Sequence, residues 1–315
     1  MTRTKQKLSK HIPDKSVFSL LVILLIGLFI KNSAFASECV MDALNLCATT
    51  VIPAIFPCAV ASGIFTSLGG GRLLGRLLRS PMNLLFGVSG SGVAVLMMGW
   101  LCGFPLGAIT GAALLRQGEI NRDELDGLLT FSSLPSPVFV ISAVGEGMLG
   151  DVRLGIIIWL SLLISAVATG LFRRAFFGAR YSESPAFCGE TDFFAAVCDS
   201  LRSSSVAMVN LCAGVVFFSV LSRLFVNALS FLSLPPLICA AFTGILELSS
   251  GCAAAAGLHS PASPILCGFI LGWSGFCVHF QVISAAGGTR KLFSYLAAKL
   301  IQGILCCALV AAFTL

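Results

Sequence analysis

The stretch GWLCGFPLGAITG, residues 99–111, lies inside an apolar run that extends from Asn83 to Gln117. Its glycines recur every four residues, a spacing that lets helix backbones approach closely in a membrane: Gly99, Gly103, Gly107 and Gly111. Pro105 stands between two of them, and a proline lacks the backbone donor that an uninterrupted helix needs. The stretch therefore predicts an unwound segment or hairpin tip, with tight helix packing as the alternative.

The composition of the whole chain places such breaks in lipid. Of the 315 residues, 57% are hydrophobic and 11% are charged, whereas soluble proteins carry about a quarter charged residues. A spanning helix needs roughly 20 apolar residues, and about nine segments of that kind are expected between Val17 and Leu315. We therefore predict an all-α fold, a polytopic transmembrane helical bundle with broken or re-entrant helices, surrounded by membrane lipid.

Basic residues predict how the chain is oriented in the membrane. The net charge is +6, but the basic residues form short clusters beside apolar segments and no continuous stripe. This pattern argues against nucleic acid as a partner and fits the excess of basic residues in cytoplasmic loops. Arg72, Arg76 and Arg79 are expected in one cytoplasmic loop, and the polar linker 176–192 is expected to be a second.

The N-terminal segment, residues 1–36, combines a basic leader, the apolar run Val17–Ile30 and the small-residue sequence Ala34-Phe35-Ala36. These features are typical of a cleavable signal peptide. We favour a retained signal anchor that forms the first span, because the chain after it is itself membrane-embedded. The linker 176–192 then divides the remainder into a first half, 37–175, and a second half, 193–315.

An internal match relates the two halves. Residues 99–104 resemble residues 272–276, and each is followed by a basic connection. A weaker match pairs the proline-broken run after Val51, which contains Pro53 and Pro57 and is expected to face the protein interior, with the run after Val206. The order of the matches agrees, which predicts an internal repeat. Paired, interrupted apolar segments are typical of a transporter's binding site.

The polar residues inside the spans are the candidate binding residues. Glu247 is expected near the middle of a span, where a carboxylate must face a cavity, a partner or an ion; a protonated carboxyl that only joins helices is the alternative. His279 and Gln281 follow the sequence 272–275 and are expected at the same cavity, unless His279 is a packing residue. Unwound backbone at Gly103, Pro105, Gly107 and Gly275 completes this expected site.

A second proline-rich break spans residues 132–137. Here Ser132, Ser133 and Ser136 offer hydroxyl groups beside freed backbone groups, although serines at such places also cap broken helices. Half-helix N-termini at such breaks attract anions. The expected solute is therefore small, and anionic or polar.

Catalytic chemistry is not expected. The sequence has no G-x-S-x-G, H-E-x-x-H or Walker A motif and no metal-ligand spacing, so we predict no enzyme activity, no metal and no cofactor. The 13 cysteines form no C-x-x-C pair and lie mostly in apolar runs, where they are expected to pack as small side chains. A coupling ion and a homo-oligomer both stay open.

The sequence resembles the sporulation integral membrane protein family of the YlbJ type, whose members contain a nucleoside-recognition or Gate domain. The resemblance extends from Ile52 to Ala286. It rests on four segments in matching order and spacing: Phe56-Pro57, residues 103–108, residues 244–247 with Gly251, and residues 272–281. Where the family has an Asn and a Gly-Pro pair in the fourth span, this chain has Ser133 and Ser136-Pro137.

The resemblance implies two Gate-like halves with re-entrant hairpins, distantly similar to concentrative nucleoside transporters. It also implies transport of dipicolinate during spore formation, in a cell membrane that is the outer membrane around the forespore. A nucleoside-type carrier and a non-transporting membrane scaffold are the alternatives. The departure at Ser133 and Ser136 bears on the solute more than on the fold.

Overall fold

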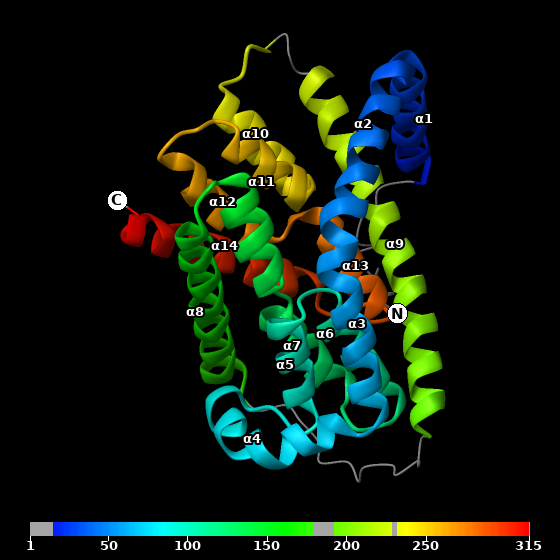
Figure 1. Cartoon of the computed structure of the whole chain (residues 1–315), viewed down its shortest axis with the longest axis vertical. Helices are drawn as coiled ribbons and strands as arrows, with labels where there is room; N and C mark the ends of the chain where they lie inside the picture. The colour runs from blue at the N-terminus through cyan, green and yellow to red at the C-terminus, as the bar shows by residue number, and fades with distance from the viewer. Residues whose placement is uncertain (1–14, 179–191, 229–231, 315) are drawn as a thin grey trace, which may run out of the picture.

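The structure is a computed structural model that describes residues 15–178, 192–228 and 232–314. Within these ranges every regular element is a helix (Figure 1), so the predicted all-α membrane bundle is confirmed. The elements are α1 Lys15–Lys31, α2 Ser33–Leu46, η1 Cys47–Val51, α3 Ile52–Ser67, α4 Gly70–Phe86, α5 Gly92–Leu101, α6 Leu106–Arg116, α7 Arg122–Ser132, η2 Phe139–Met148, α8 Val152–Phe177, α9 Phe193–Ala228, α10 Pro236–Leu246, α11 Leu248–Ala256, α12 Ala262–Trp273, α13 Gly275–Ala285 and α14 Leu292–Thr314. The two η elements are π-helices.

The expected number of nine spans is wrong. In the described part of the chain, four helices are long and apolar enough to cross a membrane, or five with one bent pair. The four are Val152–Phe176, Phe193–Ala228, Ala262–Ala285 and Leu292–Thr314. The other apolar segments are helices of 10–17 residues, because glycine and proline divide runs that hydropathy alone counts as whole spans.

The N-terminal part of the chain contains the bent pair. Residues 22–31 and 33–51 meet at 94°, and the expected boundary between residues 36 and 37 falls inside α2. Helices α2, η1 and α3 then follow one another without a loop. Val51 and Ile55 are buried on this run, whereas Pro53 and Pro57 are exposed, so the run does have an interior face but the prolines lie outside it.

The expected cytoplasmic loop around Arg76 and Arg79 is in fact a helix, α4. It lies across the end of the long helix α8 (Figure 1) and also contacts α5. Leu73, Leu77 and Leu84 on α4 are exposed, and the helix is strongly amphipathic. A basic amphipathic helix in this position is typical of one that lies in the membrane interface.

The two halves contain the same succession of elements. Each has a helical hairpin, then a helix interrupted in its middle, then a long helix: α5–α6, α7–η2 and α8 in the first half, α10–α11, α12–α13 and α14 in the second. A Cβ on Gly107 would lie 3.0 Å from the Cα of Gly99, although a straight helix would separate these residues by about 12 Å. Gly251 approaches Gly244 in the same way. Both hairpins therefore fold back on themselves.

Two expectations about the second half are corrected by these hairpins. Glu247 does not lie in the middle of a span but at the tip of the α10–α11 hairpin. The matching segments 99–104 and 272–276 are not equivalent, because the first turns a hairpin whereas the second lies inside the run Ala262–Ala285, which is long enough to cross a membrane as one span. Backbone direction at such a break depends on neighbouring helices, which a short sequence match does not record.

Candidate functional site

The tip of the first hairpin rests on the break of the next helix. The amide of Phe104 donates to the carbonyl oxygen of Leu134 at 2.8 Å, and the indole of Trp100 donates to the carbonyl oxygen of Phe131 at 2.9 Å. Gly103 has φ +84°, and a Cβ there would lie 2.6 Å from the amide nitrogen of Ser136. Only glycine gives both this backbone conformation and this approach. These contacts hold the hairpin tip against the interrupted segment between α7 and η2.

The second half has a similar contact, but here the indole and the glycine lie at the helix break and not at the hairpin tip. Trp273, at the break of the α12–α13 run, donates from its indole to the carbonyl oxygen of Ile245 at 3.1 Å. Gly275 has φ +78°, and a Cβ there would lie 3.2 Å from the amide nitrogen of Leu248 in the hairpin. Each half therefore joins a hairpin tip to a helix break through one indole and one glycine.

Glu247 caps the second half-helix of its own hairpin. Its carboxylate accepts the amide protons of Ser249 at 2.9 Å and Ser250 at 2.6 Å, and the hydroxyl of Ser219 at 3.4 Å. The side chain is buried. A carboxylate is stabilised at a helix N-terminus by the free amides and by the helix dipole. Glu247 thus already occupies the anion-binding end of α11.

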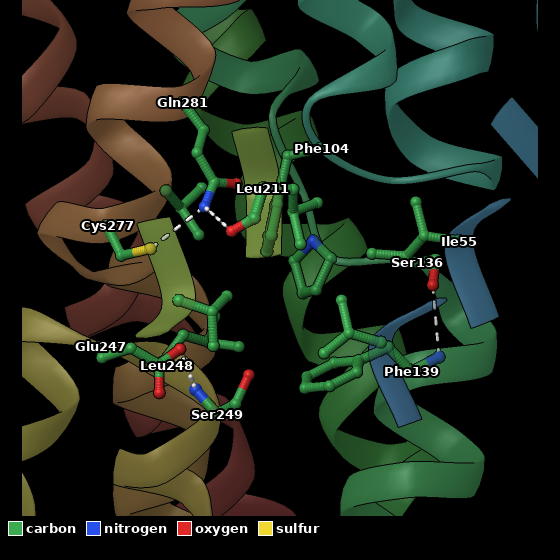
Figure 2. A pocket seen from close by; sticks show the side chains of 14 residues that line it. Ile55, Phe104, Ser136, Phe139, Leu211, Glu247, Leu248, Ser249, Cys277 and Gln281 are labelled. Atoms are coloured by element: carbon green, nitrogen blue, oxygen red, sulfur yellow. Dashed lines mark hydrogen bonds between the residues drawn. The ribbon is translucent and has the colours of Figure 1, made fainter. Parts of the chain in front are cut away.

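A small cavity lies between the hairpin tips and the helix breaks. Figure 2 shows residues of the second half on one side and residues of the first half on the other. About 30 Å³ is accessible to the centres of water-sized molecules, far below the roughly 300–1,000 Å³ of pockets that enclose drug-sized ligands. The lining residues are Val51, Ile55, Phe104, Pro135, Ser136, Phe139, Leu211, Val215, Glu247, Leu248, Ser249, Cys277, Val278 and Gln281.

The N-terminal ends of three half-helices converge on this cavity. Phe139 starts η2, Leu248 and Ser249 start α11, and Cys277 lies in the first turn of α13. The positive ends of helix dipoles therefore surround the same space. The amides at two of these ends are already bonded to side chains, that of Phe139 to the hydroxyl of Ser136 at 3.2 Å and those of Ser249 and Ser250 to Glu247. Such an arrangement favours an anionic group, and Glu247 is the only carboxylate among the lining residues.

Gln281 gives the cavity a polar group that is only partly used. Its amide nitrogen donates to the thiol of Cys277 at 3.0 Å and to the carbonyl oxygen of Leu211 at 3.5 Å. Its buried Oε1 has no hydrogen-bond partner among the described residues. A buried acceptor without a partner is unfavourable by about 1–3 kcal/mol, so this oxygen is available to a bound donor.

The predicted site residues fall into three groups. Glu247, Gln281 and Ser136 line the cavity. The glycines and the proline shape the backbone around it without lining it: Gly103 and Gly275 at the contacts above, Gly107 inside the hairpin against Gly99, and Pro105 at the start of α6. Ser132, Ser133 and His279 are buried elsewhere.

His279 belongs to a second polar cluster, away from the cavity lining. Its Nδ1 lies 3.1 Å from the hydroxyl of Tyr295, and its ring packs edge-on against Trp273 with the ring centroids 4.5 Å apart. The Nε2 atom has no partner among the described residues. The expectation that His279 and Gln281 share one cavity is therefore wrong. The two residues are two positions apart on α13, and their side chains point to different faces of the helix.

Sequence reasoning missed Lys299, which completes this second cluster. The fully buried Lys299 donates from Nζ to the carbonyl oxygen of Ser133 at 2.7 Å and to Oε1 of Gln302 at 2.8 Å. Among the described residues, no acidic side chain forms an ion pair with it. A lysine in the final apolar run is itself a signal, because ionisable residues inside spans are rare and costly.

No metal-binding group of histidine, cysteine or acidic residues occurs among the described residues. The described cysteines are all free thiols. The polar groups of the cavity are the carboxylate of Glu247, the amide of Gln281, the hydroxyls of Ser136 and Ser249, and backbone N–H groups. Such groups can bind a polar solute by hydrogen bonds.

The comparisons with known proteins bear on family and location. No family model matches the chain, and no solved structure matches it. The chain is 28% identical to the sporulation integral membrane protein YlbJ of Bacillus subtilis (strain 168) over 295 aligned residues, which cover 81% of this chain and 71% of the relative. Together with the apolar helices this supports a multi-pass membrane location. The similarity supports the predicted membership of the YlbJ-type family of sporulation integral membrane proteins.

Proposed function

We propose that this protein carries a small anionic solute across a membrane during spore formation, and that the solute is dipicolinate. The observation that carries the proposal is the cavity between the two halves, at the converging N-terminal ends of η2, α11 and α13. Interrupted helices around a polar site are typical of secondary transporters. The similarity to a sporulation integral membrane protein supports the setting.

The lining suits a planar ring that bears carboxylates. Phe104 and Phe139 offer flat apolar surface, whereas Ser136, Ser249 and Gln281 offer hydrogen-bonding groups. The positive ends of the helix dipoles favour the carboxylates, and the amides of Ser249 and Ser250 become available when Glu247 leaves them. A solute of this kind is larger than the present cavity, so this conformation corresponds to a closed state, and binding requires the hairpins to move apart.

Glu247 has a specific role in this proposal. Its carboxylate occupies the N-terminus of α11, where a solute carboxylate would otherwise bind. Entrance of an anion then requires Glu247 to leave the helix end. Solute binding is thereby linked to a movement of the hairpin tip.

Purified protein in liposomes provides the direct test. Uptake of labelled dipicolinate, and competition by unlabelled dipicolinate but not by a nucleoside such as uridine, is the expected result. Uptake of uridine in preference to dipicolinate would replace the proposal with the nucleoside carrier. If neither solute moves and the protein instead co-purifies with a fixed partner, the scaffold alternative holds.

The cellular test uses a strain that lacks the protein. Its spores are expected to contain much less dipicolinate than those of the parent, and restoring the chain should restore the content. Glu247→Gln expressed at the parent's level should fail to restore it. Normal dipicolinate content in the deletion strain would overturn the proposal.

A further inference from the structure

A groove of about 460 Å³ lies beside the closed cavity, between η1 and η2. It is lined by Thr49, Thr50, Pro53, Val138, Ser142, Ala143, Gly147 and Met148. Both walls are π-helices, which occur frequently at functional sites. The groove is open to the outside, whereas the cavity is enclosed by protein.

The polar side chains of the groove indicate water and not lipid. The polar side chains that line it are those of Thr49, Thr50 and Ser142. Two more polar residues are exposed beside the lining: Glu146, four residues after Ser142 on η2, and Asn45, four residues before Thr49 at the end of α2. The hydroxyl of Thr49 donates to the carbonyl oxygen of Asn45 at 2.8 Å, and this hydrogen bond would satisfy the hydroxyl in lipid as well. An exposed carboxylate such as Glu146 would not be stable there, because ionised groups are costly in hydrocarbon.

The groove and the cavity are separated by one layer of side chains. Each wall of the groove continues directly into a residue of the cavity lining: Thr50 is followed by Val51, and Val138 is followed by Phe139. Val51 and Phe139 are buried, and so is Ile55, one turn farther along α3. These three buried side chains are therefore the candidates for a barrier between the groove and the cavity.

The topology gives the side of the membrane to which the groove opens. The first turn of α7 contacts the loop that precedes α14, since Lys291 pairs with Asp123 at 2.6 Å and Arg122 donates to the carbonyl oxygen of Ala286 at 2.9 Å. Arg290 and Lys291 make this loop basic. The chain leaves this end through α7 and η2 and reaches the turn at residues 149–151 on the opposite side. By the preference of basic loops for the cytoplasm, the groove opens away from the cytoplasm.

We infer that the groove between η1 and η2 is the aqueous path by which a hydrophilic solute reaches the cavity from the non-cytoplasmic side, and that Val51, Ile55 and Phe139 form its gate. This inference rests on the proposed function for the solute. The water-filled groove and the gate can nevertheless be tested without any transport.

Thiol labelling tests the groove. Thr50→Cys and Ser142→Cys are treated, in membrane vesicles of known orientation, with a charged thiol reagent that does not cross membranes. The matched control is Ile164→Cys on α8, whose side chain is 49% exposed but faces lipid in a regular span. Only the thiolate reacts, so cysteines in water should be modified about tenfold faster than the control or more.

Two native cysteines show from which side of the membrane the reagent acts and whether the gate is closed. Exposed Cys198 lies near the start of the 36-residue helix α9, after the linker at the basic end, and should react only from that side. Cys277 lines the closed cavity and is buried. Phe139→Ala, or the milder Val51→Ala, should make Cys277 reactive from the groove side, as located by mass spectrometry of the labelled protein.

The outcomes separate this inference from the proposed function. Labelling at Thr50→Cys and Ser142→Cys from the non-cytoplasmic side, with Cys277 protected until the gate is truncated, supports the path even if dipicolinate is not transported. Labelling as slow as at Ile164→Cys, or only from the side that labels Cys198, overturns it. If Cys277 stays unreactive in both truncated variants, the gate is wrong.

Discussion

The Nζ of Lys299 donates a hydrogen bond to the carbonyl oxygen of Ser133, 2.7 Å away, although 166 residues separate the two in the chain. Ser133 lies at the break between α7 and η2, and Lys299 lies on α14 of the other half. Gln302, one turn farther on, donates to the carbonyl oxygen of Thr130 at 2.9 Å. The last helix thus satisfies backbone carbonyls that the break in α7 leaves without helical partners.

Lys299→Met should lower the free energy of unfolding by about 1–3 kcal/mol, because it leaves the buried Ser133 carbonyl and Gln302 amide oxygen without their donor. Thermal unfolding in detergent measures this loss. Lys291→Met is the control, since that lysine is partly exposed in a surface pair with Asp123 and should change stability by less than about 1 kcal/mol. Equal melting temperatures for the two variants would contradict the assigned role.

Glu247→Gln should impair transport while leaving the protein folded. The amide keeps the size of the side chain but loses the charge-assisted bonds to Ser249 and Ser250. In the proposed function, the movement of the charged Glu247 side chain links solute binding to the hairpin tip, so without this charge uptake should fall roughly tenfold or more. Glu38→Gln, an exposed glutamate on α2, serves as control. Unchanged uptake by Glu247→Gln, with both variants monodisperse in detergent, would remove Glu247 from the site.

Gly251→Ala should destabilise the α10–α11 hairpin. A methyl group there would overlap the backbone of Gly244, and no flexible side chain is available to move aside. Overpacking of this kind costs about 1–3 kcal/mol. Gly27→Ala on α1 is the control, because nothing lies within 4 Å of a Cβ at that position. A melting temperature as high as that of Gly27→Ala would show that the hairpin does not close as described.

Asp126→Asn should loosen the contact between α7 and the basic loop that precedes α14. Asp126 accepts hydrogen bonds from the hydroxyl of Thr289 at 3.0 Å and from the amide of Arg290 at 3.2 Å, with its side chain buried. Faster hydrogen exchange at residues 286–291 is the expected result, since the loop loses charge-assisted bonds. Asp123→Asn, at an exposed position on the same helix, should have a smaller effect. Equal exchange rates in the Asp126→Asn and Asp123→Asn variants would argue against a stabilising role of Asp126 in this contact.

The sequence established the class of the protein and the places where its helices break. Pro105, flanked by glycines, and Pro135 interrupt apolar runs, and both runs are interrupted in the structure. These predictions succeed because a missing backbone donor is a local property that lipid cannot compensate. Glu247 could be predicted as a candidate site residue for the same reason, since a carboxylate in an apolar run is costly in any arrangement of the helices.

Only the tertiary structure decided which breaks fold back and which continue. The similar segments 99–104 and 272–276 turn a hairpin in one case and continue as one span in the other, because the direction depends on which helix packs beside each glycine. Likewise Gln281 reaches the cavity while His279, two residues earlier, faces Tyr295. Contacts between residues far apart in the chain fix these outcomes, and local sequence carries no record of them.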